Sequence, residues 1–143
     1  MSEKPLILEQ SIPANPARVW QAITQHGEMR AWFFEQITDF RAEPGFSTRF
    51  EVQADSAVFL HHWEIMEVIP EQKIVYRWLY PDYPGASFVT FELSPKGAET
   101  VLQIRHEGMQ SFPQEVPEFR PESCRAGWEY FSNRLARWLA EEK

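Results

Sequence analysis

The sequence of 143 residues holds a single cysteine and no long apolar run. Cys124 has no partner for an internal disulfide or for a multi-thiolate metal site, which is typical of a protein from a reducing compartment. The longest uninterrupted apolar stretches are four residues, as at positions 31–34, whereas a membrane-spanning helix needs about 20. No signal-peptide pattern precedes Leu6. We therefore expect a cytoplasmic protein that does not enter a membrane.

Positive charge is also scarce. Fourteen lysines and arginines stand against 21 aspartates and glutamates, which gives a net charge of −7 and an isoelectric point of about 5.1. Basic residues do not gather in any window of the sequence. This balance opposes binding to nucleic acid or to an anionic membrane. We expect neither as a partner.

The motifs that mark common catalytic and cofactor sites are missing. The sequence contains no phosphate-binding loop, dinucleotide-binding glycine pattern, nucleophile elbow or zinc-protease motif. His61 and His62 are adjacent on a predicted strand, so their side chains point to opposite faces and do not chelate one ion. We predict no metal and no cofactor, and we assign no catalytic residue.

Aromatic residues, in contrast, are abundant. Six tryptophans, four tyrosines and eleven phenylalanines make up 15% of the chain. This is more than a compact core of this size normally uses, so we expect some of the rings to line a cavity.

The hydrophobic pattern changes period along the chain. A β-rich run at 6–12 is followed by a helix that starts at Asn15-Pro16, an N-cap with proline at the first helical position, and then by a short helical piece at 28–33. Apolar residues alternate with polar ones from there to residue 107, with proline and glycine turns between the runs. The predicted strands are 47–53, 58–69, 73–80, 87–94 and 100–107.

The last segment predicts one long helix. Its apolar stripe has helical spacing and comprises Cys124, Gly127, Trp128, Phe131, Leu135, Trp138 and Leu139. About 20 residues at ~1.5 Å each span about 30 Å, enough to cross a whole antiparallel sheet. The order of strand, two short helices, several strands and long helix predicts a single α+β domain over residues 1–143, in which the last helix covers the apolar face of the sheet.

Four motifs in this order resemble a known family. They are IPANPARVWQAIT (12–24) followed by Trp32-Phe33, WEIMEVIP (63–70) with IVYRW (74–78), the spaced pattern over 91–108, and GWEYF (127–131) with the leucines that follow it. Together they are similar to the activator of heat shock protein 90 ATPase homologue family, within the START-like (SRPBCC) superfamily.

The resemblance implies the helix-grip fold, in which a curved antiparallel sheet wraps around a long C-terminal helix and two short helices follow the first strand. It also implies a cavity for hydrophobic small molecules between sheet and helix. The superfamily includes lipid carriers, hormone receptors, polyketide cyclases and aromatases, so the fold does not transfer an activity. Eukaryotic cochaperone members carry a further N-terminal domain that this sequence does not show, so we expect co-chaperone activity to be the less favoured role.

The expected cavity residues share an inward position on the sheet or the helices. They are Trp32, Phe33, Phe50, Trp63, Trp78, Tyr80, Phe88, His106, Trp128 and Phe131. His106 is the best polar group near the cavity mouth, either as a ligand contact and general base or as an ordinary histidine at the core edge. Gly127 either permits a close approach to the helix or marks its start. Cys124 is interpreted as a small buried hydrophobe.

Three functions follow as alternatives. The first is binding of a hydrophobic or amphipathic small molecule between the sheet and the last helix, without catalysis. The second is an enzyme of the polyketide cyclase or aromatase type, which needs a buried polar cluster. The third is a protein-interaction module that associates with a chaperone or with itself through an exposed apolar patch.

Overall fold

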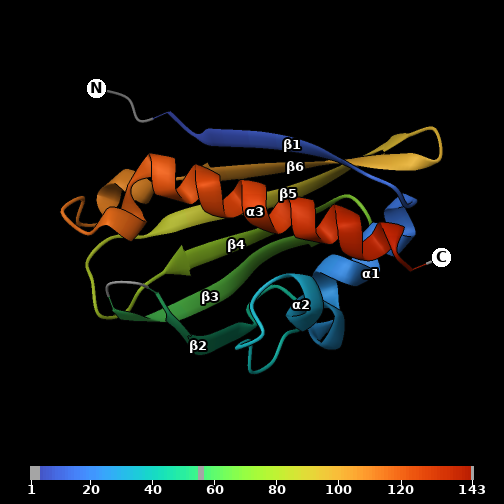
Figure 1. Cartoon of the computed structure of the whole chain (residues 1–143). Helices are drawn as coiled ribbons and strands as arrows, with labels where there is room; N and C mark the ends of the chain where they lie inside the picture. Colours follow the sequence, from blue (N-terminus) through green and yellow to red (C-terminus); the bar gives the residue numbers. More distant parts are fainter. Residues whose placement is uncertain (1–3, 55–56, 143) are drawn as a thin grey trace.

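The computed structural model describes residues 4–54 and 57–142. In chain order it contains β1 (Leu6–Ile12), α1 (Pro16–Thr24), α2 (His26–Trp32), β2 (Ser47–Gln53), β3 (Val58–Ile69), β4 (Lys73–Leu79), β5 (Ser87–Lys96), β6 (Glu99–Glu107), the short 3-10 helices η1 (Met109–Ser111) and η2 (Pro117–Phe119), and α3 (Pro121–Ala140). Figure 1 shows the strands as one curved sheet with α3 laid across it.

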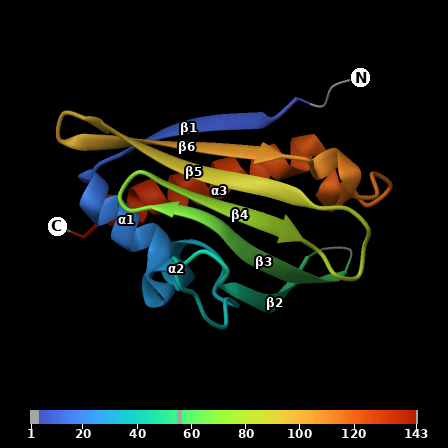
Figure 2. The ribbon, with the colours of Figure 1, turned by 180° about the vertical axis from the view of Figure 1, so that it is seen from behind.

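The sheet is antiparallel throughout, with the strand order β1-β6-β5-β4-β3-β2. Helix α3 crosses one face, and α1 and α2 lie near its C-terminal end (Figure 1). The opposite face of the sheet is turned to the viewer in Figure 2, where α3 lies behind it. The predicted α+β helix-grip architecture is confirmed. None of the described helices is long and apolar enough to cross a bilayer.

The alternation of side chains decides which residues face α3. In β4, Ile74, Tyr76 and Trp78 are buried, while their neighbours along the strand are half-buried on the other face. In β5 the same period buries Val89 and places Phe88 on the outer face, where it is 41% exposed. The prediction that Phe88 lines the cavity is therefore wrong, because it is out of phase with the inward residues of its own strand.

Two helix boundaries differ from the sequence prediction. The break between α1 and α2 falls at Gln25, whose backbone is extended, so that α2 begins at His26 and includes Gly27. Helix α3 begins at Pro121, so Gly127 lies inside it and does not mark its start. A Cβ added at Gly127 would meet nothing within 4 Å, which means that no close contact with the sheet explains this glycine.

Two glycines hold the loops at one end of the sheet close together. Gly85 and Gly108 have φ of +107° and +85°, and a Cβ on them would lie 2.5 Å from the Ser111 carbonyl oxygen and 2.9 Å from the Ala86 carbonyl oxygen respectively. Only glycine fits such approaches. The Ser111 hydroxyl accepts a hydrogen bond from the Ala86 N–H at 3.0 Å, which fastens the β4–β5 loop to η1.

The beginning of α1 is fixed by its cap. The Asn15 side chain accepts a hydrogen bond from the Arg18 N–H at 2.9 Å, and Pro16 occupies the first helical position. The Arg18 guanidinium then pairs with Glu28 of α2 and with Glu142, which follows α3. These contacts join the two short helices to the end of the long one.

We expect Asn15→Ala to lower the free energy of unfolding by about 1 kcal/mol, because it removes the acceptor for the Arg18 N–H. Asn15→Ser keeps an oxygen at the cap and should stay close to the unsubstituted protein. Urea unfolding measures both, and an equal loss in the two variants would contradict the capping role.

Candidate functional site

Aromatic rings fill the middle of the space between the sheet and α3. The Phe33 ring centroid lies 4.7 Å from that of Trp32, 5.5 Å from that of Trp63 and 4.9 Å from that of Phe131. Phe50 packs edge-on against Trp63 at 4.8 Å. Of the predicted cavity residues, Trp32, Phe33, Phe50 and Trp63 thus lie in the packed core.

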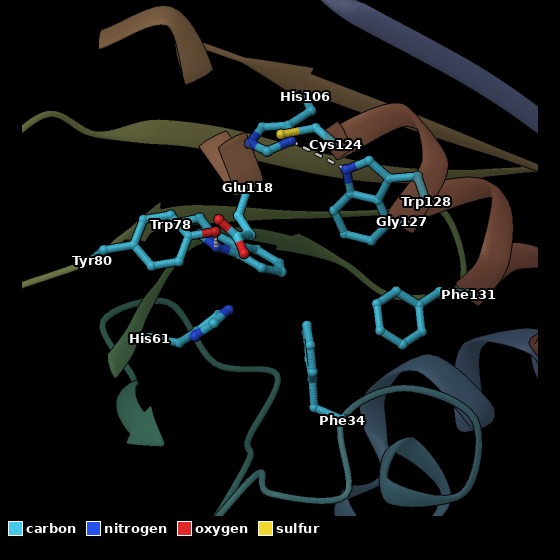
Figure 3. Close-up of a pocket in the computed structure, with 10 residues that line it drawn as sticks. All are labelled: Phe34, His61, Trp78, Tyr80, His106, Glu118, Cys124, Gly127, Trp128 and Phe131. Carbon is cyan, nitrogen blue, oxygen red and sulfur yellow. Dashed lines mark hydrogen bonds between the residues drawn. The ribbon is translucent and has the colours of Figure 1, made fainter. Parts of the chain in front are cut away.

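A cavity remains at one end, beneath the N-terminal half of α3. Its volume is about 110 Å³. The residues that line it come from β3, β4, β6, α3, η2 and the segments after α2 and β4 (Figure 3), and they are Phe34, His61, Trp78, Tyr80, His106, Glu118, Cys124, Gly127, Trp128 and Phe131.

Half of these residues were expected from the sequence. The structure brings together Trp78, Tyr80, His106, Trp128 and Phe131, and whether they bind a ligand stays a prediction. The list of cavity residues drawn from the sequence missed Phe34, His61, Glu118, Cys124 and Gly127. His61 shares the inward face of β3 with Trp63, and Cys124 and Gly127 lie on the apolar stripe of α3. The periodicity of the sequence therefore indicated that these three residues point inward. Phe34 and Glu118 lie outside α-helices and strands, where periodicity gives none.

His106 is held in a chain of hydrogen bonds and is 4% exposed. The Trp128 Nε1–H donates to His106 Nδ1 at 3.1 Å, so the ring proton is on Nε2, which donates to Ser87 Oγ at 3.0 Å. The Ser87 hydroxyl donates to the Trp78 carbonyl at 2.8 Å. Both ring nitrogens are occupied, so His106 joins α3 to the sheet and is not placed to act as a general base.

His61 differs, because only one of its nitrogens is bonded within the described residues. Its Nδ1 lies 3.1 Å from the Phe59 carbonyl oxygen. A carbonyl only accepts, so Nδ1 carries the proton and Nε2 keeps a lone pair. The ring stacks on Phe50 at 5.2 Å, and Figure 3 shows its far edge directed into the cavity. His61 therefore presents a hydrogen-bond acceptor to the cavity.

Burial keeps the hydroxyl and the thiol on the cavity wall uncharged. It raises the pKa of the Tyr80 hydroxyl, which accepts a hydrogen bond from Trp78 Nε1–H at 3.1 Å, and it raises the pKa of the Cys124 thiol to about 11. Among the described residues that line the cavity, Glu118 is the one carboxylate and none is a lysine or arginine. Within the described chain, no three histidine, cysteine, aspartate or glutamate side chains gather to hold a metal ion.

The two buried histidines predict a loss of stability in acid. Desolvation lowers the pKa of His61 and of His106 from the ordinary 6.5 to about 4. The unfolded chain therefore binds more protons between these values, so the stabilisation is complete above about pH 6.5 and is lost as the pH falls through about 4. From pH 7 to about pH 4.5 we expect a loss of about 2 kcal/mol for each histidine.

Urea unfolding at the two pH values measures this loss. In His106→Gln the pH-dependent part should shrink by about half, whatever the absolute stability of the variant. An unchanged pH dependence would contradict the buried neutral state of His106.

Three solved structures are similar to this chain over most of its length. Protein CV1439 from Chromobacterium violaceum is 24% identical, with a TM-score of 0.80 over 94% of this chain and 96% of its own. Mll3558 from Rhizobium loti is 27% identical, with a TM-score of 0.69 over 92% of this chain and 96% of its own.

The third is DynU16, described as a protein in the dynemicin biosynthetic locus. It is 25% identical, with a TM-score of 0.77 over 99% of this chain. The match covers 49% of DynU16, so this chain spans about half of that protein. No match was found among curated proteins.

The sequence also matches a family model. The model is that of the Activator of Hsp90 ATPase homolog 1-like proteins, and the match extends over residues 13–140. It includes all the residues that line the cavity. The chain belongs to the Activator of Hsp90 ATPase homolog 1-like family.

Proposed function

We propose that this protein binds a small, largely apolar molecule, about one ring in size, beneath the N-terminal half of α3. The observation that carries the proposal is the cavity of about 110 Å³ lined by five aromatic side chains. An apolar cavity of roughly 150 Å³ is known to accept benzene. This cavity is smaller but open to the surface, so it suits one ring, and a long acyl chain or several fused rings would extend out of it into water.

The charge of the residues on the cavity wall further restricts the class of ligand. Glu118 is on its wall, and no lysine or arginine among the described residues lines it. A buried anion without a cationic partner is costly. The expected ligand is therefore uncharged, and carboxylates such as benzoate or fatty acids should be excluded.

Gly127 keeps this space open. A methyl group at this position would meet nothing within 4 Å, and the residue lies on the cavity wall between Cys124 and Trp128. Glycine inside a helix costs about 1 kcal/mol relative to alanine. The room that it leaves for a ligand is a physical reason to keep a residue that weakens the helix.

A second candidate function is an enzyme of the cyclase or aromatase type. The likeness to DynU16 and the acceptor on His61 support it. His61 would take the role of base, because the ring nitrogens of His106 are both bonded. A ligand that closes several rings needs more space than this cavity offers, so binding is the first proposal.

A chaperone partner or self-association stays a prediction. The large apolar side chains that are exposed come from β1, β3, β5 and α3, and they are Ile7, Val58, Met66, Ile69, Phe88 and Tyr130. Pull-down with a purified chaperone tests this role independently of the cavity.

We expect small neutral aromatics such as toluene to raise the melting temperature and to change tryptophan fluorescence, because Trp78 and Trp128 line the cavity. At 100 times its Kd a ligand stabilises by about 2.7 kcal/mol, which melting curves detect. Benzoate and palmitate should have no effect. A panel of neutral single-ring compounds without any response would refute the proposal.

Gly127→Leu should abolish the response to toluene, because its side chain occupies the cavity. Gly27→Leu is the matched control, because Gly27 also lies in a helix with open space around its Cβ but does not line the cavity. Circular dichroism checks that both variants fold. Unchanged affinity in Gly127→Leu would place the binding elsewhere.

A further inference from the structure

An apolar ring in the cavity would leave one polar atom of the wall without a partner. His61 is 6% exposed, and its Nε2 has no hydrogen-bond partner among the described residues. A ring that shuts this acceptor off from water without offering a donor loses the hydrogen bond that water would make. This loss is avoided by a ligand that supplies a donor at this point.

The protonation state of His61 is fixed by the fold. Its neighbour on the same face of β3, Phe59, turns its carbonyl oxygen to Nδ1 at 3.1 Å, and the ring contacts both Phe50 and Phe34, with centroids 5.2 Å and 5.3 Å away. The lone pair on Nε2 therefore has a set direction, into the cavity (Figure 3). Its complement is an O–H or N–H group.

Tyr80 adds a second polar group beside it. The Tyr80 and His61 ring centroids are 4.9 Å apart and meet edge to face. The Tyr80 oxygen accepts from Trp78 Nε1–H, so its own hydrogen is left to donate, and Figure 3 shows the hydroxyl on the cavity side of the ring. One hydroxyl oxygen on a ligand can donate to an acceptor and accept from a donor at the same time. The pair of His61 and Tyr80 matches such a group.

We propose that the ligand is a phenol, a single aromatic ring whose hydroxyl donates a hydrogen bond to His61 Nε2 and accepts one from the Tyr80 hydroxyl. This rests on the proposed function and specifies its ligand class. The aromatic walls take the ring, the volume of the cavity suits a single ring, and the absence of lysine and arginine among the described lining residues disfavours the phenolate anion.

Isothermal titration calorimetry at neutral pH with phenol, toluene and anisole tests the proposal. Toluene has the shape of phenol without the hydroxyl, and anisole has an oxygen that only accepts. Phenol should bind about tenfold more tightly than either, because a satisfied hydrogen bond contributes about 1 kcal/mol or slightly more.

His61→Phe should lower the ratio of phenol to toluene affinity about tenfold while toluene still binds. His62→Phe is the matched control, because His62 is the next residue of β3 and its Nδ1 accepts from Arg49 on the other face of the sheet. It should leave the ratio unchanged. A ratio that falls equally in both variants would overturn the proposal.

A second measurement does not depend on a variant. In ¹⁵N NMR spectra of the histidine side chains, phenol should shift the His61 Nε2 resonance in the direction of a hydrogen-bonded acceptor, and toluene should not. If toluene and anisole bind as tightly as phenol and this resonance does not move, the phenol assignment is wrong while the binding function stands. If none of the three compounds binds, the proposed function itself is wrong.

Discussion

The hydrogen bond between Trp128 on α3 and His106 on β6 connects the two layers of the molecule beside the cavity. It continues through Ser87 to the backbone of β4, so one chain of polar groups crosses three strands and the helix. Such a chain stabilises the protein only when every member has its hydrogen-bond partners, because each group is buried. It fastens α3 to the sheet at the wall of the cavity, which both Trp128 and His106 line.

The packing between α3 and the sheet differs at the two ends of the helix. Toward the C-terminal end, Leu135 and Leu139 are fully packed, and Arg18 ties this end to α1 and α2. Toward the N-terminal end, the helix places the small residues Cys124 and Gly127 over the sheet, and the surrounding rings leave a cavity open. The tight half supplies the stability that permits an imperfectly packed half, since unfilled volume in a core costs free energy.

The sequence predicted the architecture closely because apolar residues recur clearly with both the helical and the strand period. The bounds of β1, β2 and β3 coincide with the runs of alternating residues, and α3 follows the apolar stripe that includes Trp128 and Leu139. The sequence did not predict which rings fill the core and which line the cavity. Trp63 and Trp78 both point inward from the sheet, and only the packing of the whole interface places one in the core and the other on the cavity wall. Phe88 was assigned to the wrong face although its strand was right.

The chemistry of the site depended on contacts that no pattern contains. The acceptor on His61 exists because of the backbone oxygen of Phe59, and the occupied state of His106 exists because of a tryptophan 22 positions later. Residue type and spacing indicated that histidines lie near aromatic rings. They did not indicate which nitrogen of each ring carries the proton.

The position of α3 at the end of the described chain has a consequence for biosynthesis. The strands whose aromatic face it covers leave the ribosome first, and β1 finds its partner β6 only after about a hundred further residues have been made. Until the last helix emerges, the rings of Phe33, Trp78 and Phe91 lack Trp128, which packs against all three and shields them from water and from other nascent chains. Protection of this growing surface is thus a matter of translation timing, and a chain that stops before Pro121 would present an open aromatic sheet.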